Sequence, residues 1–123
     1  MGKQQPSVSF PTEWLRGMTS LAVLAVLASG PSYGYAISTA LAQAGLGQIK
    51  GGTLYPILTR LEADGFLAST WEHGPSGPGR KIFSLTELGE SHLRDLQSQW
   101  RIFATNLDQL ITQGGDSEQA KEA

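Results

Sequence analysis

Residues 51–65 read GGTLYPILTRLEADG, and residues 79–86 read GRKIFSLT. The apolar residues that recur at helical spacing in the first stretch are Leu54, Ile57, Leu58 and Leu61. They predict a short helix over Gly52–Asp64 with one apolar side and one polar side. Pro56 lacks an N–H and is tolerated only near a helix start, which agrees with a helix that begins close to Gly52.

The second stretch predicts the return strand of a β-hairpin. Two strand-like runs, Phe66–His73 and Arg80–Leu85, flank the sequence GPSGPG, and such glycine and proline clusters mark turns. The aromatic residues predicted to pack this hairpin onto the helices are Trp71 and Phe83. A small helix beside a hairpin that carries paired cations is typical of a winged helix-turn-helix, and this arrangement indicates DNA binding.

Two further helices are predicted before this helix and hairpin. Thr12 caps the first, which begins at Glu13 and stops at Gly30-Pro31. Ser32 caps the second, Tyr33–Gln43, in which helical spacing turns Tyr33 or Ile37 inward and Tyr35 outward.

A long helix is predicted from Thr86, its cap, to about Ile111. Six residues spaced alternately three and four apart form what we call the apolar seam: Leu93, Leu96, Trp100, Phe103, Leu107 and Leu110. A helix of this length spans roughly 38 Å. Because a small domain cannot cover such a seam, we expect a second chain to pair with it in a homodimer, with the seam as the interface.

The fold class is therefore mainly α with a small β-hairpin, a winged helix-turn-helix followed by a long C-terminal dimerisation helix. The expected parts are a flexible arm at 1–11, the DNA-binding domain at 12–85, the dimerisation helix at 86–111 and a disordered tail at 112–123.

Composition excludes several functional classes. The 123 residues suit one domain, and the absence of cysteine with only two histidines excludes disulfides and leaves no expected metal or cofactor. No catalytic motif is present, so we do not expect an enzyme and name no catalytic residue. The chain opens with no signal peptide, and no apolar run reaches the roughly 20 residues of a membrane span, so we expect a cytoplasmic protein without a membrane partner.

Charge is divided unevenly along the chain. Residues 1–81 carry a net charge of +2 and residues 82–123 a net charge of −4, for a total of −2. Phosphate binding depends on the local field of one face, so acidity in the last helix does not forbid it. The small positive excess predicts modest non-specific affinity for DNA.

Hydroxyl, guanidinium and ammonium groups on the polar side of the Gly52–Asp64 helix and in the hairpin suit phosphates and base edges. The helix before them adds a tyrosine beside its free N–H groups. The residues predicted to contact DNA are Tyr35, Lys50, Thr53, Tyr55, Pro56, Thr59, Arg60, Gly79, Arg80 and Lys81. The alternative for the helix face and for the wing cations is an ordinary solvated surface, and the alternative for Tyr33 and Tyr35 is that one of them belongs to the core.

Trp100 lies near the middle of the long helix, on the apolar seam. In a two-fold dimer, residues near the middle of a paired helix meet their own copies. Trp100 is then either a plain hydrophobic anchor or one of two indole planes that form a slot for a flat aromatic ligand. The residues assigned to this ligand site are Trp14, Leu15, Met18, Trp100 and Phe103.

Three blocks of the chain resemble the PadR family of transcriptional regulators: GPSYGYAI at 30–37, GTLYPILTRLEADG at 52–65 and GRKIFSLTELG at 79–89. The single C-terminal helix is similar to that of the compact subfamily. The resemblance implies a homodimeric winged-helix repressor, and some compact members sandwich planar drugs with a tryptophan that matches Trp100. Ile82-Phe83 departs from the tyrosine or second aromatic that usually follows Arg-Lys in the family.

We therefore expect a repressor that binds a pseudo-palindromic double-stranded operator and responds to a planar aromatic effector. The rival is a non-regulatory protein that sequesters aromatic compounds, which needs Trp100 but not Arg80, Lys81 or Thr59. A third possibility is an interaction module that offers the apolar seam to a foreign partner.

Overall fold

The computed structural model describes residues 9–74, 77 and 79–122, with side chains described as far as Gly114. The chain divides into two compact units, Met1–Leu93 and Arg94–Ala123, and each is considered by itself. Residues 1–8 of the predicted arm lie outside the described residues.

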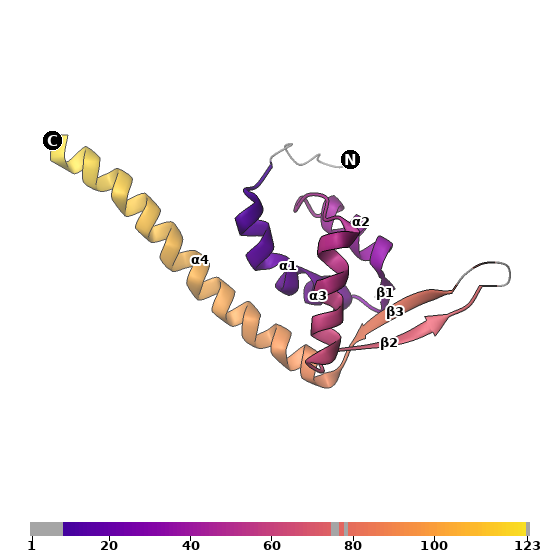
Figure 1. Ribbon diagram of the computed structural model, residues 1–123. Helices are drawn as coiled ribbons and strands as arrows, with labels where there is room; N and C mark the ends of the chain where they lie inside the picture. Colours follow the sequence, from indigo (N-terminus) through magenta and orange to yellow (C-terminus); the bar gives the residue numbers. More distant parts are fainter. Residues whose placement is uncertain (1–8, 75–76, 78, 123) are drawn as a thin grey trace. The chain divides into compact units, whose positions relative to one another are not determined.

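Three helices form the body of the first unit (Figure 1): α1 at Thr12–Leu27, α2 at Gly34–Gln43 and α3 at Gly51–Ala63. The three helices pack on one another, and α3 also packs on the sheet. The residues that the helices bury in the common core are Val23, Leu24, Leu27, Ile37, Leu41, Leu54, Leu58 and Leu61. The apolar side predicted for α3 therefore faces inward as expected, with Ile57 only partly covered at its edge.

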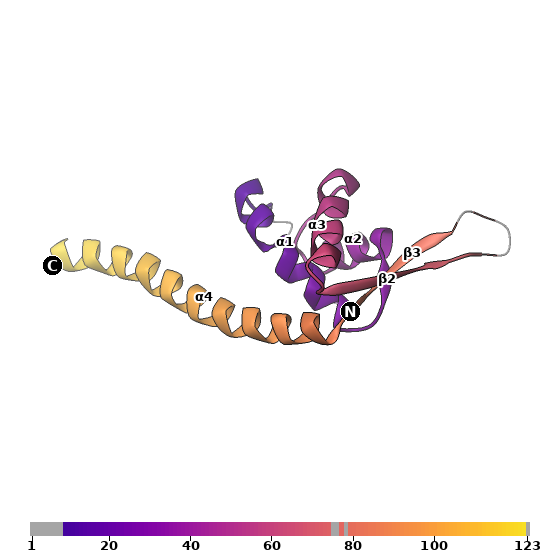
Figure 2. The ribbon, with the colours of Figure 1, turned by 60° about the horizontal axis from the view of Figure 1, so that its bottom comes forward.

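Three strands form an antiparallel sheet in the order β1-β3-β2. They are β1 at Ser32–Tyr33, β2 at Leu67–Glu72 and β3 at Arg80–Leu85. β2 and β3 form the predicted hairpin, which extends beyond the three helices in both Figure 1 and Figure 2. We call this hairpin the wing.

The predicted caps of the first two helices are wrong. Pro11, not Thr12, is the N-cap of α1, and α2 begins at Gly34 with Tyr33 as its N-cap. Ser32 pairs with Phe83 as part of β1. The physical reason is that β3 offers backbone partners to this segment, which a local capping argument does not consider.

The two aromatic residues predicted to pack the wing differ in their burial. Phe83 is 2% exposed and belongs to the core, which confirms its assignment, whereas Trp71 is 62% exposed and the prediction for it is wrong. Trp71 lies near the outer end of β2, opposite Lys81, in the part of the wing that extends past the helices.

The long helix α4 runs from Glu87 to Glu122. It continues beyond Ile111, so the predicted helix end and the disordered tail from residue 112 differ from the structure. The residues that follow Ile111 include no proline, and Glu, Gln, Ala and Lys near the end are good helix formers. Ala123 lies outside the described residues.

The first turn of α4 is bound to the turn that ends α3, an arrangement we call the joint. The Gly89 N–H donates to Thr86 Oγ1 over 2.9 Å, which confirms Thr86 as the cap. Thr86 Oγ1 donates to the Gly65 carbonyl over 2.7 Å, and the Thr86 N–H donates to the Phe66 carbonyl over 3.1 Å. His92 stacks on the Phe66 ring with 4.0 Å between centroids.

Candidate nucleic-acid interface

The polar side of α3 is open to solvent along its whole length. Because its leucines face the core, the residues between them face outward: Thr53, Tyr55, Pro56, Thr59 and Arg60 are all exposed. Hydroxyl and guanidinium groups thus share one surface of a short helix, which is the composition that reads base edges and phosphates.

A shallow pocket of about 200 Å³ joins this surface to the start of α2. Its lining residues are Gly34, Tyr35, Ser38, Gly51, Leu54 and Tyr55. The Ser38 hydroxyl donates to the Ile49 carbonyl over 2.9 Å and so ties α2 to the connection that precedes α3. The pocket brings together Tyr35 and Tyr55, whose side chains are 74% and 49% exposed.

Both helices begin at this pocket without a side-chain cap. Among the described residues, no side chain bonds to the free N–H groups at the start of α2 or α3, and neither first turn contains an acidic residue. Free N–H groups at a helix start favour an anion. Lys50, the exposed N-cap residue of α3, adds a positive charge at the same end.

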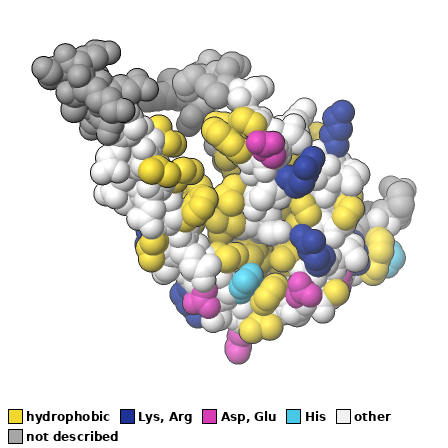
Figure 3. Space-filling view, turned by 60° about the vertical axis from the view of Figure 1, so that its left-hand side comes forward, with side chains coloured by type: hydrophobic (Ala, Val, Ile, Leu, Met, Phe, Trp, Pro, Cys, Tyr) yellow, Lys and Arg dark blue, Asp and Glu magenta, His cyan; other side chains and the backbone are white. Residues whose placement is uncertain are grey.

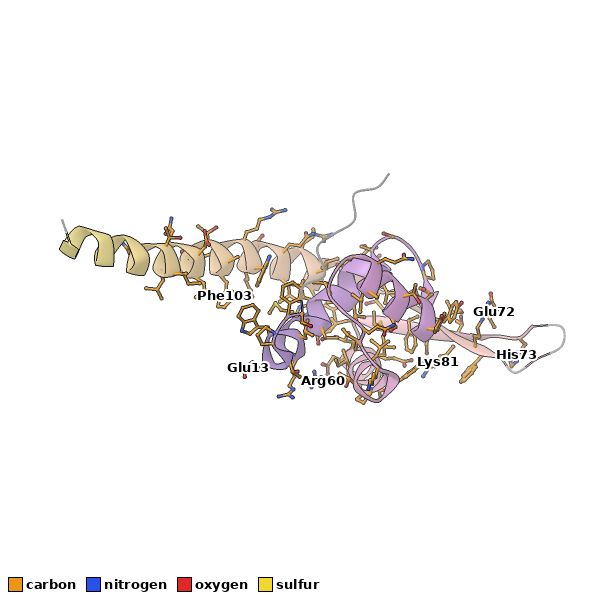
Figure 4. All side chains as sticks on the ribbon, turned by 90° about the horizontal axis from the view of Figure 1, so that it is seen from above. Glu13, Arg60, Glu72, His73, Lys81 and Phe103 are labelled. Atoms are coloured by element: carbon orange, nitrogen blue, oxygen red, sulfur yellow. The ribbon has the colours of Figure 1, made fainter. Side chains whose placement is uncertain are left out.

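The two wing cations are engaged on opposite faces of β3, because successive residues of a strand point to opposite sides. Arg80 lies 3.4 Å from the Glu72 carboxylate, and its guanidinium is 4.1 Å from the centroid of the Tyr33 ring. Lys81 Nζ lies 3.3 Å from the Glu62 carboxylate, on the other side. Figure 4 shows Glu72 and Lys81 on opposite sides of the wing.

Glu62 is a residue that the sequence argument missed. It lies in the last turn of α3 and accepts hydrogen bonds from Ser69 of β2 and from Lys81 of β3, so one carboxylate joins the helix to both strands. The Ser69 hydroxyl and the Lys81 ammonium hold the pKa of Glu62 below its ordinary value, against the opposing effect of burial. The available signal was the alternation of side chains along the strand at 80–81. It places Arg80 and Lys81 on opposite faces, so the two cations cannot share one role.

Gly79 stands where the two strands approach each other below the tip. A side chain there would place its Cβ 2.8 Å from His73 Nδ1 and 3.2 Å from the Glu72 carbonyl oxygen. The close approach of the wing backbone therefore accounts for a glycine at this position, independently of any contact with DNA.

The residues assigned to the ligand site fall in two units. Trp100 and Phe103 lie on α4 with 5.8 Å between ring centroids. Trp14 is 60% exposed at the start of α1, where it stacks on Phe10, while Leu15 and Met18 are half-buried. Because the five residues belong to two separate units, the ligand site stays a prediction.

Five of the six seam residues lie in the second unit or at its start. Leu93 is the exception because it is 7% exposed and forms part of the core of the first unit, and its place in the dimer interface stays a prediction. Leu96 is half-buried, and the exposed members are Trp100, Phe103, Leu107 and Leu110. Figure 3 shows hydrophobic side chains following one another along α4 on the face in view.

Two other features are absent from the described residues. In this part of the chain no helix is both long enough and apolar enough to cross a membrane. Within the same residues no three acidic or histidine side chains gather as they would around a metal ion.

Comparison with known proteins agrees with this architecture. The model of the transcriptional regulator PadR-like family matches residues 23–95. An uncharacterised protein of Lysinibacillus sphaericus is 30% identical over 88 residues, which cover 70% of this chain and 81% of that protein.

Solved structures of PadR regulators share the fold. A PadR family regulator from Eggerthella lenta is 38% identical with a TM-score of 0.74, over 81% of this chain and 87% of its own. A PadR-like transcription factor from Bacteroides fragilis is 33% identical with a TM-score of 0.70, over 80% and 95% of the two chains. A PadR-like regulator from Bacillus cereus is 26% identical with a TM-score of 0.71, over 80% and 96%. With the family model matched across the end of α1, α2, α3, the wing and the joint, this chain is a member of the PadR-like family of transcriptional regulators.

Proposed function

We propose that this regulator is a homodimeric repressor that binds a pseudo-palindromic operator and responds to a planar aromatic ligand. The observation that carries the DNA-binding part is the exposed polar face of α3, which continues through the Tyr35–Tyr55 pocket to two uncapped helix starts. Since such a regulator acts on genomic DNA, we place it in the cytoplasm.

In this proposal α3 enters the major groove. Thr53, Thr59 and Arg60 meet base edges, with Pro56 on the same surface, while Tyr35, Tyr55, Lys50 and the free N–H groups hold phosphates. Two such helices in a dimer would read half-sites roughly 34–36 Å apart.

The wing contributes Arg80 as its principal phosphate ligand. Its pair with Glu72 is largely exposed, with side-chain exposures of 53% and 60%, so exchange of the carboxylate for a phosphate costs little. Lys81 is 36% exposed and bound to a carboxylate that also accepts from Ser69, so its first role is to hold the wing against α3.

Dimerisation is proposed through the exposed part of the apolar seam. Trp100, Phe103, Leu107 and Leu110 recur at heptad spacing and are between 40% and 65% exposed. A row of this kind along a helix is stable in water when a second helix covers it. PadR regulators are typically dimers, which supports the same arrangement.

The effector site is proposed between the two copies of Trp100, with Phe103 beside each indole. A ligand that separates the indoles changes how the two α4 helices cross, and so changes the separation of the two α3 helices. Replacement of Trp100 by alanine is expected to abolish binding of a planar dye such as acridine orange with the circular dichroism spectrum retained. Unchanged dye affinity in that variant would refute the pocket.

The DNA-binding proposal is tested by fluorescence anisotropy with a duplex from directly upstream of the protein's own gene, at two salt concentrations. We expect tight binding that weakens with salt and that is lost in an Arg80→Ala/Lys81→Ala variant. Absent or salt-insensitive binding, combined with acridine orange binding that depends on Trp100, would favour the rival function of sequestering aromatic compounds.

A further inference from the structure

The ring of Tyr55 rests against the backbone of Gly34, a glycine at the first position of α2. A methyl group at Gly34 would lie 2.5 Å from Cζ and 3.0 Å from Cε1 of Tyr55, and closer still to the hydroxyl oxygen. Real carbon atoms do not approach so closely, so even alanine at position 34 would displace the tyrosine. Gly34 itself is buried.

A second glycine touches the opposite edge of the same ring. A methyl group at Gly51 would lie 3.5 Å from Cδ2 and 3.6 Å from Cε2 of Tyr55, which is ordinary contact. The ring therefore lies between the first residue of α2 and the first residue of α3, and its hydroxyl is placed beside the start of α2. The side chain remains 49% exposed, so the ring is held while its outer surface stays open.

The backbone of Gly34 does not require glycine. The glycines with positive φ are Gly30, Gly45, Gly47 and Gly65, and Gly34 is not among them. At a helical residue alanine is the better helix former, so local structure alone would favour a side chain here. The space that the Tyr55 ring occupies is the remaining reason for a glycine.

We infer that Gly34 is a positioning residue for DNA binding, which fixes the Tyr55 side chain in its DNA-contacting position before DNA arrives. The inference rests on the proposed contact of Tyr55 with DNA. A side chain that is already ordered loses less conformational freedom on binding. An immobilised side chain of this kind corresponds to roughly a 3- to 10-fold difference in affinity.

A double-mutant cycle tests the inference, with the upstream duplex as the probe and anisotropy as the readout. Gly34→Ala is expected to weaken binding about 3- to 10-fold in the Tyr55 protein. The same change is expected to alter affinity by less than about 2-fold in a Tyr55→Ala background, because no ring remains to be displaced. In the Tyr55→Ala background, Gly34→Ala should also leave the melting temperature unchanged. If the glycine had a merely structural role, the melting temperature would fall.

Gly52→Ala is the matched control. Gly52 is a glycine at the start of α3 and has no positive φ, and a methyl group there would meet nothing within 4 Å beyond its chain neighbours and the backbone of its own helix. We expect this variant to show no coupling to Tyr55. Equal loss of affinity from Gly34→Ala with and without the Tyr55 ring would overturn the inference.

A second readout is independent of DNA. The chain has three tyrosines, so protein labelled with 3-fluorotyrosine gives few ¹⁹F resonances, and the one lost in Tyr55→Phe identifies Tyr55. Gly34→Ala should shift that resonance and Gly52→Ala should not. An unmoved Tyr55 resonance in Gly34→Ala would overturn the contact itself.

The outcomes separate the inference from the proposed function. Wild-type protein that does not bind the duplex refutes the proposed function and, with it, the role of Gly34. Wild-type binding with a loss in Tyr55→Ala but none in Gly34→Ala overturns only the inference. A coupled loss together with a shifted Tyr55 resonance supports both.

Discussion

Neutralising Glu62 should loosen the wing from α3, and it should do so only at a pH at which the Glu62 carboxyl is ionised. The Glu62 carboxylate accepts from Ser69 and lies 3.3 Å from Lys81 Nζ, and the two charged side chains are 32% and 36% exposed. A partly exposed ion pair contributes about 0.2–1 kcal/mol, and the hydrogen bond from Ser69 persists in weaker form with glutamine. We therefore expect Glu62→Gln to lower the free energy of unfolding by about 1 kcal/mol at pH 7.

The dependence on pH follows from the direction of the pKa shift. The hydrogen bond from Ser69 and the charge of Lys81 hold the pKa of Glu62 below its ordinary value of 4.5. Folding therefore favours the ionised form, and this stabilisation is complete above the ordinary pKa and disappears as the pH falls through the lower pKa of the folded state. The difference between wild type and Glu62→Gln should be present at pH 7 and should shrink as the pH falls below 4.5.

Urea unfolding followed by circular dichroism measures this difference, at one fixed protein concentration because a dimer's stability depends on it. Glu72→Gln is the matched control, since its pair with Arg80 is more exposed, and we expect a change within about 0.5 kcal/mol. A Glu62→Gln variant as stable as wild type at pH 7 would refute the reasoning. A deficit that keeps its size however far the pH falls below 4.5 would also refute it.

Three further predictions concern the wing, α4 and the joint. In anisotropy titrations, Arg80→Ala should weaken DNA binding and reduce the slope of log affinity against log salt by about 1, whereas the control Arg101→Ala on α4 should change neither. An unchanged slope in Arg80→Ala would show that Arg80 does not contact DNA. Leu107→Asp should give the mass of one chain in light scattering, because a carboxylate would face the partner helix, and a persistent dimer would place the interface elsewhere. Thr86→Val should cost about 1–2 kcal/mol in thermal unfolding through the lost bonds to Gly89 and Gly65, and a loss below about 0.5 kcal/mol would contradict the role given to the joint.

Helical periodicity was sufficient to predict the exposed face of α3. Three leucines at spacings of three and four fix the inward side, and the outward residues follow from them. Other local signals predicted the wing strands and the cap of α4. Turn residues separate the two short apolar runs of the wing, and the bond from the Gly89 N–H to Thr86 Oγ1 joins residues only three apart.

Contacts distant in sequence decided what could not be predicted. From the sequence alone, Ser32 could be either a helix cap or a strand residue. Its backbone pairing with Phe83 places it in a strand. Trp71 and Phe83 are both aromatic strand residues, yet only Phe83 lies where the helices cover the sheet. Lys81 reads as a free cation until Glu62 and the wing are brought together by the packing of α3 on β2.

The joint fixes where α4 begins. Thr86 is bonded to Gly65 and Phe66, and its hydroxyl accepts from the Gly89 N–H, so the first turn of the long helix is anchored to the turn that follows α3. Farther along, the exposed seam depends on spacing alone, because residues three or four apart share one face of a helix. One residue inserted between Leu96 and Trp100 would turn Trp100 by about 100° away from Leu96. Four inserted residues would return Trp100 to within about 40° of its original direction, so insertions near whole turns preserve the seam and single insertions divide it.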